Sequence, residues 1–265
     1  MPLCTRRRFS SSPRCVAVPR PVRRRSFPAD RCGNDAAQAA RLERLPGFRR
    51  EIELVAAALG RGSVQRLGRD FTAPAVQQTR LQDFRIVHFA THGLLPGDLS
   101  CLTEPAIMVS NAPNAPDASG GFLPASAIMR LRMDADLVIL SACNTAGPGV
   151  PGGSEQSAEA LSGLARAFFV AGARGVLASH WLASDLAATV LMTRMLTIQN
   201  GAETDGRAVS SGQALQRAQL GLIEANFGGG SLSHPFYWAA FTLIGDGRRE
   251  AAPQTAQGAT AAIGG

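Results

Sequence analysis

The sequence predicts an α/β fold with a mostly parallel sheet, and three apolar runs carry that prediction. They are Ile-Val-His-Phe at residues 86–89, Leu-Val-Ile-Leu at residues 137–140 and Gly-Val-Leu-Ala-Ser at residues 175–179. Short apolar runs bounded by polar and small residues are typical of strands buried on both faces of a parallel sheet. Helical patterns separate them, as the connections between parallel strands require.

The remaining elements follow from periodicity and from turn residues. Apolar residues recur at helical spacing in five segments, and a short further helix is expected after Thr72, with Pro74 in its first turn. Ser184 and Asp185 are suited to begin the fourth of the five helices. We expect these helices at residues 49–59, 123–131, 158–171, 186–196 and 211–225, further strands at 106–109 and 236–244, and loops at 111–121, 199–206 and 228–230.

Composition divides the chain into one domain and two tails. Residues 1–31 hold nine arginines and one acidic residue, whereas the rest has 18 arginines and 19 acidic residues. Segments rich in Arg, Pro and Ser bury too little apolar surface to fold. We therefore expect a disordered tail at residues 1–44, a folded domain at 45–247 and a second disordered tail, rich in Gly and Ala, at 248–265. We find no helical repeat within residues 1–44.

The same composition bears on location and partners. The five cysteines are scattered and odd in number, which fits a reducing compartment better than a disulfide framework. No apolar stretch has the ~18 residues of a membrane span, and the arginines of the tail have no aromatic residues interleaved. We expect a cytoplasmic protein with no nucleic-acid or membrane partner. All 27 basic residues are arginine, which we interpret as the coding bias of a GC-rich, bacterial genome.

Two side chains stand at the ends of neighbouring predicted strands. Cys143 follows the strand at residues 137–140, and His92 follows the strand at residues 86–89. Carboxyl ends of strands are where open α/β folds place their ligands. The interval from His92 to Cys143 is 51 residues, close to the roughly 50 of caspase-type peptidases. Cys143 is thus a candidate nucleophile, although a small apolar core residue is the alternative reading.

Several segments, taken together and in order, resemble one known family. The sequence is similar to the CHAT domain, a caspase-like cysteine peptidase domain often found with tetratricopeptide repeats, over residues 45–247. The segments are His88-Phe-Ala-Thr-His92-Gly93, Leu140-Ser-Ala-Cys143-Asn-Thr-Ala146, Leu161-Ser-Gly-Leu-Ala-Arg-Ala-Phe168, Ala171-Gly-Ala-Arg-Gly-Val176, and His234-Pro-Phe-Tyr-Trp238 through Gly245-Asp246.

This resemblance implies a three-layer caspase-like sandwich and a cysteine endopeptidase. Cys143 would be the nucleophile and His92 the general acid and base, with the N–H groups of Gly93 and Cys143 binding the oxyanion. Trp181 and Asp185 are candidates for the substrate cleft. The resemblance implies no metal and no organic cofactor, a protein or peptide substrate, and a possible regulatory or tetratricopeptide-repeat partner. The alternative is a catalytically silent CHAT module that acts as a signalling adaptor.

Two further motifs suggest other chemistry. His88 and His92 have the i, i+4 spacing of two zinc ligands on a helix, but in a strand this spacing separates them by about 13 Å. We interpret His88 as a structural histidine that supports the site. The segment Gly147-Pro-Gly-Val-Pro-Gly152 matches the dinucleotide fingerprint, yet its two prolines remove backbone N–H groups that a phosphate needs. A nucleotide-dependent α/β enzyme is the third hypothesis.

Overall fold

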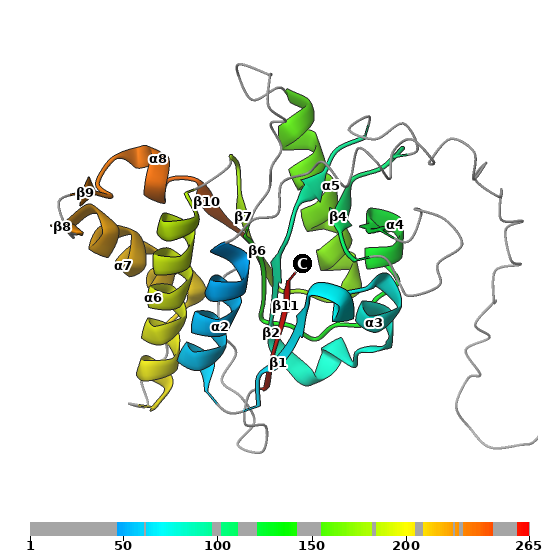
Figure 1. Ribbon diagram of the computed structural model, residues 1–265, viewed down its shortest axis with the longest axis horizontal. Coiled ribbons are helices and arrows are strands. Elements are labelled where there is room, and N and C mark those ends of the chain that lie inside the picture. Colours follow the sequence, from blue (N-terminus) through cyan, green and yellow to red (C-terminus); the bar gives the residue numbers. More distant parts are fainter. Residues whose placement is uncertain are drawn as a thin grey trace, which may run out of the picture.

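A six-stranded sheet lies at the centre of the computed structural model (Figure 1), which describes residues 47–60, 62–96, 102–110, 121–141, 155–181, 184–204, 209–224, 226–227, 230–245 and 259–264. In spatial order the strands are β1 (Val64–Leu67), β11 (Ala259–Gly264), β2 (Phe84–Ala90), β6 (Leu137–Ser141), β7 (Gly175–Ser179) and β10 (Phe241–Gly245). All neighbours are parallel except β7 and β10. The predicted α/β fold with a mostly parallel sheet is confirmed.

Helices cover both faces of this sheet (Figure 1). One layer consists of α2 (Gly47–Leu59), α6 (Asp185–Thr204) and α7 (Ser211–Glu224). The other consists of α3 (Ala73–Gln78), α4 (Ala125–Ile128) and α5 (Glu155–Ala171). These three layers are compatible with the caspase-like sandwich that the sequence predicts.

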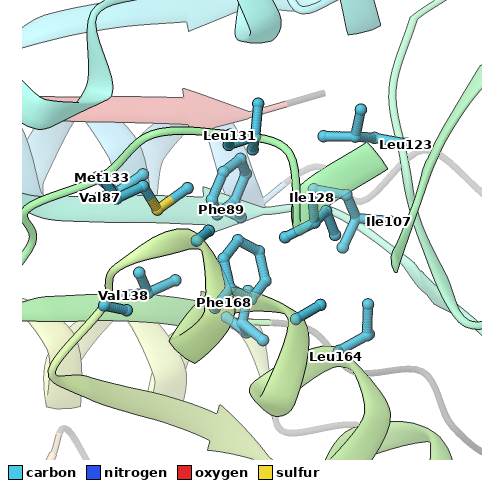
Figure 2. Packing of buried hydrophobic residues seen from close by; sticks show 14 of the residues in the cluster. Val87, Phe89, Ile107, Leu123, Ile128, Leu131, Met133, Val138, Leu164 and Phe168 are labelled. Atoms are coloured by element: carbon cyan, nitrogen blue, oxygen red, sulfur yellow. The ribbon is translucent and has the colours of Figure 1, made fainter. Parts of the chain in front are cut away.

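Alternation along the strands divides the core in two, because successive side chains of a strand point to opposite faces of the sheet. Val87, Phe89 and Val138 pack with α3, α4 and α5. Figure 2 shows this cluster, in which the rings of Phe89 and Phe168 are 5.3 Å apart. Leu137, Ile139 and Leu177 pack on the opposite face, against α2, α6 and α7. Burial on both faces explains why these strands read as continuous apolar runs.

The smaller elements complete the domain. A second sheet contains β3 (Gly93–Leu94), β4 (Ala106–Met108) and β5 (Phe122–Pro124), and a hairpin contains β8 (Asn226–Phe227) and β9 (Gly230–Ser231). A helical turn, α8 (Pro235–Trp238), and two 3-10 turns, Gly68–Asp70 and Leu81–Asp83, join larger elements. Thr72 caps α3 as predicted, with its Oγ1 accepting from the N–H of Ala75 at 3.3 Å. None of the helices in the part of the chain described here is long and apolar enough to cross a membrane.

Three expected boundaries were wrong. Residues 123–131 begin with strand β5, and α4 is a single short helix after it. Residues 236–244 contain α8 before β10, because Pro235 and His234 begin a helical turn in which the N–H of Phe236 donates to Nδ1 of His234. Residues 199–204 continue α6. Two polar side chains at the start of this segment have partners in other helices: Gln199 donates to Ser211 of α7, and Asn200 donates to the carbonyl of Ala58 in α2.

The carboxyl end of the chain contains a strand that was not expected from the sequence. Residues 248–265 were expected to form a disordered tail, but Ala259–Gly264 form β11, which lies between β1 and β2 and is parallel to both. Alanine and glycine have low β propensity and make up four of its six residues, so the strand signal of this segment is weak. Its place in the sheet depends on backbone pairing with two neighbours. The expected tail at residues 1–44 lies outside the described residues.

Candidate active site

Three parallel strands end together at one edge of the sheet. Ala90, the last residue of β2, pairs with Ser141, the last residue of β6, and Leu140 pairs with Ala178 near the end of β7. The residues that directly follow these strands therefore share the carboxyl edge, where α/β folds bind ligands. His92 follows β2 by two residues, and Trp181 follows β7 by two residues.

His92 lies in the turn between the main sheet and the small sheet. Its carbonyl accepts a hydrogen bond from the N–H of Met108 at 2.8 Å, and the hydroxyl of Thr91 donates to the carbonyl of Met108 at 2.8 Å. These two bonds fix the backbone on both sides of the turn. The His92 side chain exposes 9% of its surface, whereas that of His88 exposes none. Of the two histidines, His92 is therefore the one at the edge of the core.

The N–H group of Gly93 points away from β4, the neighbouring strand of the small sheet. Gly93 lies opposite Ile107 in the antiparallel pair β3–β4, and the bond between Met108 and His92 spans the flanking positions. In an antiparallel ladder this arrangement identifies Gly93 and Ile107 as a pair that is not itself hydrogen-bonded. The N–H of Gly93 consequently faces the side opposite β4. This orientation is compatible with donation to a ligand beside His92.

The predicted nucleophile Cys143 lies outside the described residues, and so does the glycine-rich loop at residues 147–152. The strand that leads to Cys143 is described up to Ser141. From Ile86 to Ala90, each residue of β2 pairs with the residue of β6 that is 51 positions later, so that Ile86 pairs with Leu137 and Ala90 with Ser141. The interval between His92 and Cys143 is also 51 residues.

The two candidate cleft residues belong to different parts of the domain: Trp181 follows β7, on the other side of β6 from β2, and Asp185 lies beside the start of α2. Trp181 is half-buried, and its indole N–H donates to the carbonyl of Phe236 in α8 at 3.0 Å. Asp185 is the first residue of α6. Its side chain contacts Gly47 at the start of α2 so closely that a Cβ on Gly47 would be 2.6 Å from Oδ2 of Asp185. The role of both residues in binding substrate stays a prediction.

A buried polar cluster beneath the edge was only partly expected. Nε2 of His88 is 2.7 Å from Oγ of Ser141 and 3.0 Å from Oε1 of Glu51 in α2. All three side chains are buried. His88 was predicted to be structural, whereas Glu51 and Ser141 were not predicted. Glu51 had one signal, its place on the same helical face as Val55, and Ser141 had none.

The two histidines with zinc-like spacing, His88 and His92, lie on and just after a strand, not on a helix. Within the part of the chain that the structure describes, no group of three or more His, Cys, Asp or Glu side chains is arranged to hold a metal ion. His88 instead contacts Ser141 and Glu51. Its observed partners are therefore those of a structural histidine.

The chain matches a known protein family. A family profile described as CHAT domain matches residues 3–246. The match ends within one residue of the predicted domain end at 247 and begins well before the predicted start at 45. No curated protein sequence matches the chain.

Proposed function

Because the chain belongs to the CHAT domain family, we propose that it is a cysteine endopeptidase with Cys143 as nucleophile and His92 as general acid and base. The register of β2 and β6 is the observation that carries this proposal. The ladder pairs residues 51 positions apart up to Ala90 and Ser141. His92 and Cys143 each follow this last pair by two residues in the sequence, so both belong to the segments that leave the sheet at the same edge.

The reaction is acyl transfer. His92 takes the thiol proton of Cys143, and the sulfur forms a bond to the carbonyl carbon of the substrate peptide. When the tetrahedral intermediate collapses, the C–N bond breaks, and the leaving amine receives the proton from His92. A water molecule, deprotonated by His92, then attacks the thioester. Its cleavage releases the carboxylic acid product and restores the thiol.

Charge that develops on the carbonyl oxygen needs donors already in place. We assign this role to the N–H groups of Gly93 and Cys143. The orientation of the Gly93 N–H away from β4 supports its part in this assignment. Since these donors belong to the backbone, a side-chain substitution cannot remove them. A probe that leaves a tetrahedral adduct on Cys143 is needed to detect them.

For the substrate cleft we propose Trp181 and Asp185. The indole of Trp181 is held to α8 by its hydrogen bond to Phe236, so its ring can form a fixed wall for an extended peptide. Asp185 would select a basic side chain by charge. Comparing probes with arginine or norleucine before the scissile bond tests this role. Asp185→Asn should reduce the preference for arginine and leave the rate with norleucine unchanged.

The central experiment uses an electrophilic peptide probe and identifies the labelled cysteine by mass spectrometry. We expect the probe to label Cys143. In His92→Ala the rate of labelling should fall by about 10² to 10⁴-fold, the range typical of a general acid and base. Cys101→Ala is the matched control and should be labelled like the wild type. Circular dichroism and melting temperature verify that each variant is folded.

The opposite outcome would support the adaptor hypothesis. Labelling that is unchanged in His92→Ala, or that falls on Cys101, would contradict the peptidase. A protein that cleaves no peptide, and whose Cys143 reacts like an ordinary thiol, would be a silent module with a caspase-like fold. The cytoplasmic location that we propose from the scattered cysteines would be tested separately, by fractionation of the producing cell.

A further inference from the structure

A sealed polar cluster lies directly beneath the proposed site. Glu51, His88 and Ser141 expose 1%, 0% and 1% of their surfaces, and they come from α2, β2 and β6. His88 precedes His92 by four residues, and Ser141 precedes Cys143 by two. Apolar residues of the second core cluster, such as Ile139 and Val55, belong to the same three elements. Polar groups buried in such surroundings cost stability unless they are paired.

The composition is that of a Ser-His-Glu hydrolase triad, but the geometry is not. In a triad the acid and the serine bind opposite nitrogens of the imidazole ring. Here Oγ of Ser141 and Oε1 of Glu51 both approach Nε2 of His88. The cluster is also closed to solvent, so no substrate reaches Ser141. A second hydrolytic site is therefore excluded, and another role is required.

Two contacts converge on Nε2 of His88. The contact with Oγ of Ser141 is a hydrogen bond at 2.7 Å, whose direction depends on the tautomer of the ring. Oε1 of Glu51 lies 3.0 Å from the same nitrogen and has no hydrogen bond of good geometry among the described residues. The ring of His88 is therefore held between Ser141 of β6 and Glu51 of α2.

The hydrogen bond between His88 and Ser141 joins β2 and β6 at the point where their backbone pairing ends. Ala90 and Ser141 are the last paired residues of β2 and β6, and the ends of strands fray unless they are tied down. The bond from His88 crosses from one strand to the other next to this last pair. The contact with Glu51 adds helix α2, which itself packs against α6. The ends of both site strands are thus tied to the helical layer.

We propose that Glu51, His88 and Ser141 are positioning residues, which fix the ends of β2 and β6 and thereby the approach of His92 to Cys143. This inference rests on the proposed function, since it needs Cys143 and His92 to react together. A displacement of about 1 Å between reacting groups lowers rates by as much as about a hundredfold. The cluster contacts no substrate, so its effect is on geometry.

The test compares Ser141→Ala and Glu51→Gln with the wild type. We measure alkylation of Cys143 by iodoacetamide as a function of pH, with mass spectrometry of the peptide that contains Cys143. In both variants we expect the rate near neutral pH to fall about ten- to a hundredfold and the pH profile to move upward. Ser141→Thr, which keeps the hydroxyl, should restore most of the rate.

Asp136→Asn is the matched control. Asp136 also joins β2 and β6, through Arg85, but at the opposite end of the strands. This variant loses a polar cross-link of the same two strands and should keep the wild-type alkylation profile. An effect as large as that of Ser141→Ala would show that general loosening of the sheet explains the result, and would overturn the proposal.

A second measurement separates this inference from the peptidase proposal. If His92→Ala leaves the alkylation of Cys143 unchanged, the proposed function fails. The ring resonances of His92 in an NMR spectrum still report on position. The chemical shifts of the His92 ring should change in Ser141→Ala and stay the same in Asp136→Asn. Unchanged resonances and an unchanged alkylation profile in folded Ser141→Ala, or in Glu51→Gln if Ser141→Ala does not fold, would refute the positioning role.

Discussion

Strands β2 and β6 are joined by polar side chains at both ends, and the two cross-links differ in their exposure to water. At the amino end, Nε and Nη2 of Arg85 are both 2.7 Å from Oδ2 of Asp136, and Nη1 of Arg174 is 3.0 Å from Oδ1. The side chains of Arg85 and Asp136 expose 18% and 15% of their surfaces. At the carboxyl end, Glu51, His88 and Ser141 expose almost nothing.

The comparison shows that the polar contacts at the two ends of this strand pair differ in their energetic cost and in their role. Ion pairs that water partly reaches, as at the amino end, gain less from their charges, because solvent screens them and solvates the charges when they separate. A buried polar contact is costly to break, because each group left without a partner also loses water. Such a contact adds little stability over an apolar core, which points to a requirement for position at the carboxyl end.

The largest expected effect is at the buried cluster. His88→Ala leaves the carboxylate of Glu51 and the hydroxyl of Ser141 buried without the ring. We expect the free energy of unfolding to fall by about 3–5 kcal/mol, measured by urea denaturation followed by circular dichroism. The double variant Glu51→Met, His88→Leu should recover most of this loss. A loss below about 1 kcal/mol in His88→Ala would remove the distinction between the two ends.

The second prediction concerns the backbone beside the exposed cross-link. Gly172 ends α5 with φ +110°, and a Cβ there would be 2.2 Å from the carbonyl oxygen of Met133. We expect Gly172→Ala to lower the free energy of unfolding by about 3 kcal/mol. Gly201, exposed within α6, has no atom near its Cβ position. Gly201→Ala should raise stability by about 0.5–1 kcal/mol, so equal effects at both glycines would contradict the steric argument.

A smaller effect is expected at the centre of the exposed cross-link. Asp136→Asn weakens the contacts with both Arg85 and Arg174. We expect a loss of about 1–2 kcal/mol, since these are hydrogen bonds between charged groups that are partly buried. The same measurement in 1 M NaCl should give a smaller difference from the wild type, because salt screens the ion pairs. A loss that does not depend on salt would mean that packing, and not charge, is responsible.

The smallest effect is expected at Asp134, whose side chain is 68% exposed and 2.6 Å from Nη2 of Arg174. Asp134→Asn should change the melting temperature by little more than the error of the measurement, corresponding to less than about 0.5 kcal/mol. With Asp136→Asn and His88→Ala it forms a series ordered by burial. If Asp134→Asn cost as much as Asp136→Asn, exposure would not explain the difference between the ends.

The elements that were predicted well are the buried strands, because burial on both faces leaves a continuous apolar run in the sequence. The runs at residues 86–89, 137–140 and 175–179 became β2, β6 and β7, because strands covered on both faces need apolar residues throughout. β11 was missed because its pairing depends on β1 and β2, which are distant in sequence. The turn α8 was missed because the aromatic residues after Pro235 have high β propensity, and the helical cap outweighed that propensity.

In the candidate site, too, some residues were predicted from the sequence and others were not. His92 and Gly93 were predicted because they follow a clear strand and belong to a distinctive motif. Glu51 was not predicted, since an acidic residue in an amphipathic helix is most often on its solvated face. Only the fold shows that this position faces His88. Buried polar partners on separate elements leave no periodic pattern in a sequence, so a structure is needed to find them.

The constant register of β2 and β6 has a consequence for how related chains should be compared. An insertion in the connection between β4 and β5 would lengthen the interval between His92 and Cys143 without moving either strand. A single insertion inside β2, between Ile86 and Ala90, would leave the interval from His92 to Cys143 unchanged, but it would shift the end of β2 by one residue relative to β6 and so reverse the faces of the side chains there. Alignments of such chains should therefore count from the ends of the two strands, because evolution can change loop lengths freely while it preserves the pair.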